Sequence, residues 1–144
     1  MTTEVIAATV PATPDPVVRS SSGETSIGIQ WSAPDNGYNS ITGYIIKSNG
    51  GSGSTFSEIG TTGPATTTFT ETGLTNGQVY EFIVIAENEV GASEPSSPTA
   101  LRVAVVPDAP GAPVKTFADG STIEISWTAP SNNGGSVVTK YEIF

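Results

Sequence analysis

The stretch WSAPDNGYNSITGY, residues 31–44, returns later in the chain as WTAPSNNGGSVVTKY, residues 127–141. The opening residues of the two stretches, Trp31 and Trp127, are 96 positions apart, whereas the closing residues, Tyr44 and Tyr141, are 97 positions apart. The additional residue falls in the polar Gly/Asn-rich middle, where repeated units accept insertions because such segments form surface loops. The sequence therefore contains two copies of one structural unit.

Alternation of apolar and polar residues predicts short β-strands throughout the first copy. In ETSIGIQW, residues 24–31, Ile27, Ile29 and Trp31 alternate with polar or small residues, as in a strand with one buried face. In residues 78–88 both alternating sets contain apolar residues, which predicts a central strand that is partly covered on both sides. Seven such segments at a spacing of about 8–12 residues indicate an all-β antiparallel sandwich.

The composition argues against several classes of function. The 144 residues carry 14 acidic and 5 basic side chains, giving a net charge of −9, and the basic residues are scattered. Nucleic acid or an anionic membrane surface would require a basic patch, so neither is an expected partner. Cysteine and histidine are absent, which removes disulfides, histidine-dependent nucleophiles and the usual zinc sites. We expect no enzymatic activity, no cofactor or metal, and no membrane insertion, because no apolar run approaches ~20 residues.

Several residues in the right order make the chain similar to tandem fibronectin type III domains. Pro14 precedes the first expected strand, Trp31 lies on the second and Tyr44 on the third, and GLTNGQVYEFIVIAENEVGASEPS, residues 73–96, resembles the family's most recognisable segment. The resemblance implies an immunoglobulin-like β-sandwich of seven strands. It also implies that Tyr80 is a "tyrosine corner", with a buried ring and a hydroxyl bonded to nearby backbone. The residues expected to carry folding and not chemistry are Trp31, Tyr44, Leu74, Tyr80, Trp127 and Tyr141.

The repeat and the resemblance together divide the chain into four segments. We predict an N-terminal extension at 1–13, a complete fibronectin type III domain at 14–104, a short Pro-rich linker at 105–112 and a partial second domain at 113–144. The second copy is expected to hold about three strands, with about four more to follow in a longer array. The linker has several prolines and no Ser/Gly run, so it should be stiff and join the copies as a semi-rigid rod.

Two loops of the first copy hold candidate contact residues. Tyr38 lies among small polar residues in DNGYNS, residues 35–40, a composition seen in binding loops. Asn88, Glu89 and Val90 lie in the turn that the resemblance equates with one that often carries adhesion motifs, although no Arg-Gly-Asp triplet occurs. The alternative for both loops is a plain solvated turn.

The resulting functional hypothesis is a non-catalytic structural spacer and protein–protein interaction module of adhesion or scaffold type. Its expected partners are other domains of the same array or a protein ligand, in an extracellular or cell-surface setting. One alternative is an intracellular filament- or axoneme-associated scaffold, cytoskeletal or ciliary, because SNNGGSVVTKYEI resembles a phrase common in the giant muscle proteins. Another is an accessory module of a secreted polysaccharide-degrading enzyme.

Overall fold

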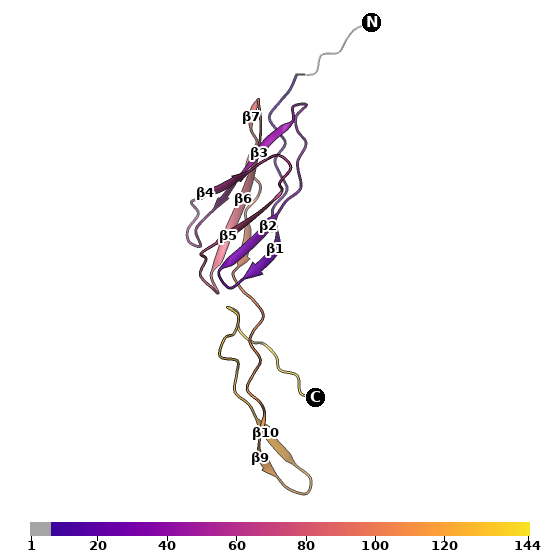
Figure 1. Ribbon diagram of the computed structural model, residues 1–144, viewed down its shortest axis with the longest axis vertical. Helices are drawn as coiled ribbons and strands as arrows, with labels where there is room; N and C mark the ends of the chain where they lie inside the picture. The colour runs from indigo at the N-terminus through magenta and orange to yellow at the C-terminus, as the bar shows by residue number, and fades with distance from the viewer. Residues whose placement is uncertain (1–6) are drawn as a thin grey trace.

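The computed structural model describes residues 7–144, which contain strands and turns and no helix. The first copy forms a β-sandwich, and the second copy continues beyond one end of it along the long axis of the molecule (Figure 1). The strands of the first copy are β1 (Val18–Gly23), β2 (Ser26–Gln30), β3 (Ile41–Ser48), β4 (Ser57–Thr62), β5 (Thr68–Thr72), β6 (Val79–Asn88), β7 (Gly91–Ala92) and β8 (Thr99–Arg102).

Two antiparallel sheets make up the sandwich. One sheet has the order β1-β2-β5, and the other has the order β4-β3-β6, with β7 and β8 both paired to β6. The predicted all-β sandwich is confirmed. The strand that was expected to be central, β6, pairs with three other strands. The two-residue strand β7 is an addition to the seven that were predicted.

Strand β6 keeps its hydrogen bonds even where no regular strand lies beside it. Strand β8 pairs with β6 only over residues 79–82. Further along, the N–H groups of Val84 and Ala86 donate to the hydroxyl oxygens of Ser96 and Ser93, both at 3.0 Å. The backbone N–H groups of these two serines donate back to the carbonyls of Val84 and Ala86. Buried serines thus replace the ladder that the prolines of this segment cannot supply.

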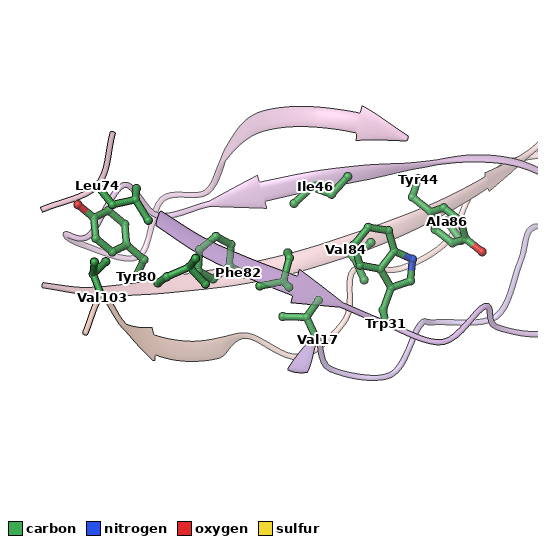
Figure 2. Close-up of a cluster of buried hydrophobic side chains, with 12 residues drawn as sticks. Val17, Trp31, Tyr44, Ile46, Leu74, Tyr80, Phe82, Val84, Ala86 and Val103 are labelled. Atoms are coloured by element: carbon green, nitrogen blue, oxygen red, sulfur yellow. The ribbon is translucent and has the colours of Figure 1, made fainter. Parts of the chain in front are cut away.

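The core fills the space between the two sheets and is made by alternating residues of the strands. On β6 the alternating residues Tyr80, Phe82, Val84 and Ala86 are buried, and Ile83 on the opposite face is also buried. Figure 2 shows these side chains with Tyr44 and Ile46 of the neighbouring strand β3, and with Trp31, which follows β2 in the other sheet. The buried hydrophobic cluster consists of Val17, Ile27, Ile29, Trp31, Tyr44, Ile46, Leu74, Tyr80, Phe82, Val84, Ala86 and Val103.

Trp31 and Tyr44 form an edge-to-face aromatic pair inside this core. Their ring centroids are 5.4 Å apart and their planes are inclined by 67°, which is a favoured geometry for aromatic rings. Trp31 directly follows β2 and Tyr44 lies on β3, so the pair connects the two sheets. Trp31 is 6% exposed and Tyr44 1% exposed, and burial raises the pKa of the Tyr44 hydroxyl above its ordinary value.

Tyr80 closes the opposite end of the core. Its hydroxyl oxygen accepts a hydrogen bond from the Thr75 backbone N–H at 3.0 Å, the local backbone bond that the resemblance implied. Leu74 lies beside the Tyr80 ring, and Val103 closes the same end (Figure 2). The turn that leads into β6 is thereby fixed to the strand that it precedes.

The second copy reproduces the beginning of this plan. It contains the hairpin β9 (Val114–Ala118) and β10 (Ile123–Ser126), followed by an aromatic pair, Trp127 and Tyr141, at 5.6 Å and 62°. Two strands are present where about three were expected, because residues 127–144 form no strand. In the first copy β3 is held between β4 and β6, and residues 113–144 include no counterpart of either. Tyr141 is consequently 37% exposed.

Removing the Trp31 ring should strongly destabilise the first copy. We expect Trp31→Ala to lower the free energy of unfolding by about 3–5 kcal/mol, because it removes a large buried ring from a closed core. The matched control is Trp127→Ala, because the Trp127 ring lies in the second copy, outside the buried core of the first. This change should leave the main unfolding transition nearly unchanged. Urea denaturation followed by circular dichroism measures both. Equal losses in the two variants would contradict this assignment of the core.

Glu71 on β5 should make stability depend on pH in an unusual direction. Its Oε2 atom is buried without a hydrogen-bond partner, and burial raises the pKa of this carboxyl. The folded state therefore keeps the proton to a higher pH than the unfolded state, and stability falls as pH rises through these pKa values. Glu71→Gln does not titrate, so it should gain stability relative to the parent between about pH 3 and about pH 7. A difference in urea midpoint that is the same at both pH values would refute this.

Candidate functional site

The candidate contact loops lie together at the end of the first copy where the chain enters (Figure 1). Three segments meet there: the lead-in 9–12, the loop 35–40 and the turn 88–91. Asn88 joins them, because its side-chain Nδ2 donates to the carbonyl oxygens of Thr9 at 2.7 Å and Asn36 at 3.0 Å. Its Oδ1 accepts from the backbone N–H groups of the turn at 2.9 and 3.1 Å. We call this end of the molecule the upstream face.

Asn88 must be corrected as a candidate contact residue. Its side chain is only 6% exposed, and both its donor and its acceptor are used inside the molecule. An amide suits this position because it can donate to carbonyls on one side and accept from N–H groups on the other. The role of Asn88 is to hold the three segments in place.

Side-chain and backbone hydrogen bonds fix the shape of the loop 35–40. The Asp35 carboxylate accepts from the Gly37 N–H at 2.9 Å, and the Asn36 amide oxygen accepts from the Tyr38 N–H at 3.0 Å. The Thr9 N–H donates to the Gly37 carbonyl at 2.8 Å, so the lead-in runs along the loop. These short local bonds are the turn chemistry that Asp and Asn side chains favour.

Tyr38 has an unusual backbone for an aromatic residue. Its φ angle is 60°, in the left-handed region that bulky side chains rarely adopt, and its side chain is 73% exposed. Val90 on the neighbouring turn is 49% exposed and Val10 on the lead-in is 42% exposed, while Glu89 is exposed beside them. Tyr38, Glu89 and Val90 therefore remain candidates for contact with another protein, and Val10 joins them.

The second copy builds the same loop with the same hydrogen bonds. The Gly134 N–H donates to Asn132 Oδ1 at 2.8 Å, the Gly135 N–H donates to Asn133 Oδ1 at 3.0 Å, and the Val105 N–H donates to the Gly134 carbonyl at 2.8 Å. Every participating loop residue lies 97 positions after its counterpart in the first copy. The additional residue of the second copy is therefore Ser131, at the start of the loop. Comparison of the letters alone does not reveal this correspondence.

This second loop contacts the far end of the first copy. Gly135 lies against the turn 75–78: a Cβ atom placed on Gly135 would come within 2.8 Å of the Gly77 backbone nitrogen. The turn itself is fixed by the Arg102 guanidinium, which donates to the Gly77 carbonyl oxygen. Asn132 Nδ2 also donates to Glu24 Oε1 at 3.4 Å. The domain junction thus consists of a loop, a lead-in segment and the end of the preceding sandwich.

Two features of residues 7–144 bear on small-molecule chemistry. Within residues 7–144, no group of three His, Cys, Asp or Glu side chains is placed to hold a metal ion. An apolar hollow does occur in the second copy, lined by Trp127, Tyr141 and neighbouring prolines. The counterparts of its aromatic residues in the first copy are core residues, so this hollow is a partly open core.

Across residues 7–144 there is no helix with the length and apolar character needed to cross a membrane.

Changing Asn88 should loosen the upstream face. We expect Asn88→Ala to lower the free energy of unfolding by about 1–3 kcal/mol, because it leaves buried carbonyl and N–H groups unpaired. Asn88→Asp should do no better, since it presents an oxygen to carbonyl oxygens. The control is Glu89→Ala at the exposed neighbouring position. The direct measurement is hydrogen exchange of the Thr9 amide. Unchanged protection of this amide in Asn88→Ala would show that the Asn88 side chain is not needed to hold the three segments together.

Comparison with known proteins agrees with this architecture. The family model "Fibronectin type III domain" matches residues 12–102. Human fibronectin type-III domain-containing protein 3A is 38% identical over 68 residues, which are 44% of this chain and 6% of that protein. The striated-muscle M-protein of Gallus gallus is 33% identical over 138 residues, covering 93% of this chain and 9% of that protein.

Solved structures give the same result. The crystal structure of domains A168–A170 from titin superposes with a TM-score of 0.60 and 31% identity, covering 67% of this chain and 33% of that one. This chain spans less than a tenth of the length of the two curated relatives described above. Because the matched residues span the eight-strand sandwich, the chain belongs to the fibronectin type III domain family.

Proposed function

We propose that this chain is a non-catalytic structural spacer and protein-interaction module that works as part of a longer array. The observation that carries the proposal is the domain junction. Only two residues separate the end of β8 at Arg102 from Val105, whose N–H is already bonded to the loop of the second copy at 2.8 Å. A module that served as a freely moving tether would not hydrogen-bond its linker in this way.

The junction supports a semi-rigid connection for two physical reasons. The lead-in of the second copy is bonded at two points, since the Asp108 N–H also donates to the Asn132 carbonyl at 3.0 Å. The prolines that follow restrict the backbone of the rest of the segment. We therefore retain the proposed boundaries of 14–104 for the first domain, 105–112 for the linker and 113–144 for the partial second domain, with 7–13 as the described part of the extension 1–13.

Among the settings considered, we propose a filament-associated scaffold. Support comes from the 33% identity to a striated-muscle M-protein over 93% of this chain, and from the structural likeness to titin domains at 31% identity. Neither relative adds support for the extracellular setting that we expected first. The proposed partners are neighbouring domains of the same array and a protein ligand bound through the loops.

Distance measurements between two spin labels test the semi-rigid junction. The chain has no cysteine, so Glu58→Cys on β4 and Lys115→Cys on β9 supply two unique labelling positions. We expect a narrow distance distribution for the natural junction, because the linker is bonded to the loop. The control carries about six Gly/Ser residues inserted between Val103 and Ala104, which should broaden the distribution. A natural chain as broad as this control would exclude the spacer function.

A further inference from the structure

The upstream face of the first domain has the architecture of a docking surface. At the domain junction, the loop 132–136 contacts the end of the preceding sandwich, and the lead-in that begins at Val105 is hydrogen-bonded to this loop. The first domain carries the same loop and the same lead-in on its upstream face, joined by the matching bond from the Thr9 N–H to the Gly37 carbonyl. The bonds inside the loop also match, with each loop residue 97 positions before its counterpart. Both copies carry this surface, and in the second copy it contacts the end of the preceding sandwich. The upstream face of the first copy is therefore suited to contact the end of another sandwich.

One position differs between the two loops in a way that decides what can dock. Gly135 has a φ of 83° and lies flat against the Asn76–Gly77 turn. A Cβ atom there would be 2.8 Å from the Gly77 backbone nitrogen and 1.7 Å from Asn76 Oδ1. The Asn76 side chain could rotate away, but the Gly77 backbone could not move without changing the turn. Only glycine permits this approach.

Tyr38 occupies the equivalent position in the first domain. Its φ of 60° lies in the same region as that of Gly135, although the left-handed region is unfavourable for a bulky residue. The ring is 73% exposed and contributes nothing to the core of its own domain. A strained, exposed aromatic residue in the place where the sister loop has glycine points to a contact outside the domain.

We propose that Tyr38 is a specificity-determining residue of the upstream face. It excludes a neighbouring sandwich that ends in an Asn76–Gly77 turn, and it selects one whose corresponding turn is set back far enough to receive a phenol ring. The flanking exposed residues Val10 and Val90 favour an apolar patch on the selected end, and the exposed carboxylate of Glu89 beside them disfavours an acidic one. This inference rests on the proposed spacer function, because it assumes that the domains of the array dock end to end.

The test places a second junction in one molecule. An additional copy of residues 8–103 is joined directly ahead of Ala8, so that Val103 is followed by Ala8 as it is naturally followed by Ala104. The added copy contains the whole buried cluster from Val17 to Val103 and is therefore a complete sandwich. Spin labels are attached through Glu58→Cys in the added copy and Ser20→Cys in the original first domain.

Three versions of the original first domain distinguish steric exclusion from backbone strain. With Tyr38 we expect a broad distance distribution, because the Asn76–Gly77 turn of the added copy cannot approach. Tyr38→Gly should narrow the distribution to the width measured at the natural junction. Tyr38→Asn is the matched control, because asparagine accepts a left-handed backbone but retains a Cβ atom, so its distribution should stay broad.

Several results would overturn the inference. A narrow distribution with Tyr38 present, a narrow one for Tyr38→Asn, or a broad one for Tyr38→Gly would each do so, provided that circular dichroism shows a folded chain. The reciprocal change Gly135→Asn at the natural junction should broaden the Glu58–Lys115 distribution, and no change there would also count against it. A broad natural junction in the unmodified chain would instead refute the spacer function itself.

Discussion

The edge-to-face contact between Trp31 and Tyr44 is the interaction on which the first domain depends. It brings a residue that follows one sheet into contact with a residue on the other, inside the buried cluster that fills the sandwich. The buried strand residues of β2, β3 and β6 pack around this pair. The second copy keeps the same pair at nearly the same angle, although it contains only the two strands β9 and β10 within the described residues. The contact is therefore a property of the local chain as well as of the finished sandwich.

Much of the fold could be predicted because its signals are local. Ile27, Ile29 and Trp31 have the period of two that one buried face requires, and the structure buries all three. The covering of β6 on both faces was predicted from the alternation of apolar residues. The hydrogen bond to the Tyr80 hydroxyl was implied by the family resemblance. Each of these expectations concerned residues that are close together in the sequence, where periodicity and turn chemistry act directly.

The upstream face was harder to predict because its partners are distant in the chain. Asn88 is of a residue type that is common in exposed turns, yet its side chain donates hydrogen bonds to carbonyls 79 and 52 positions away. No periodic pattern reports such a contact. The same holds for Gly135, whose importance depends on a turn of the preceding domain. Side chains that join separate segments, or separate domains, are recognised only when the topology brings those segments together.

The loops show how one framework can carry two different surfaces. Asp and Asn side-chain oxygens accept hydrogen bonds from backbone N–H groups and so fix the backbone of both loops. The residue at positions 38 and 135 can therefore vary between an aromatic ring and no side chain at all. The framework determines where the surface lies, and this single position determines its shape. In a repeated protein, such a division lets neighbouring units differ in what they contact while they share one fold.

The presence of the Trp127–Tyr141 pair beside only two strands, β9 and β10, bears on the order of folding. In both copies a single loop separates the two rings in sequence, so bringing them together involves little loss of chain entropy. Strand β6, by contrast, is recruited from a much greater sequence separation. A nucleus made of the first hairpin and its aromatic pair can therefore form before the distant strands arrive, and the transition state for folding would already contain this corner of the core.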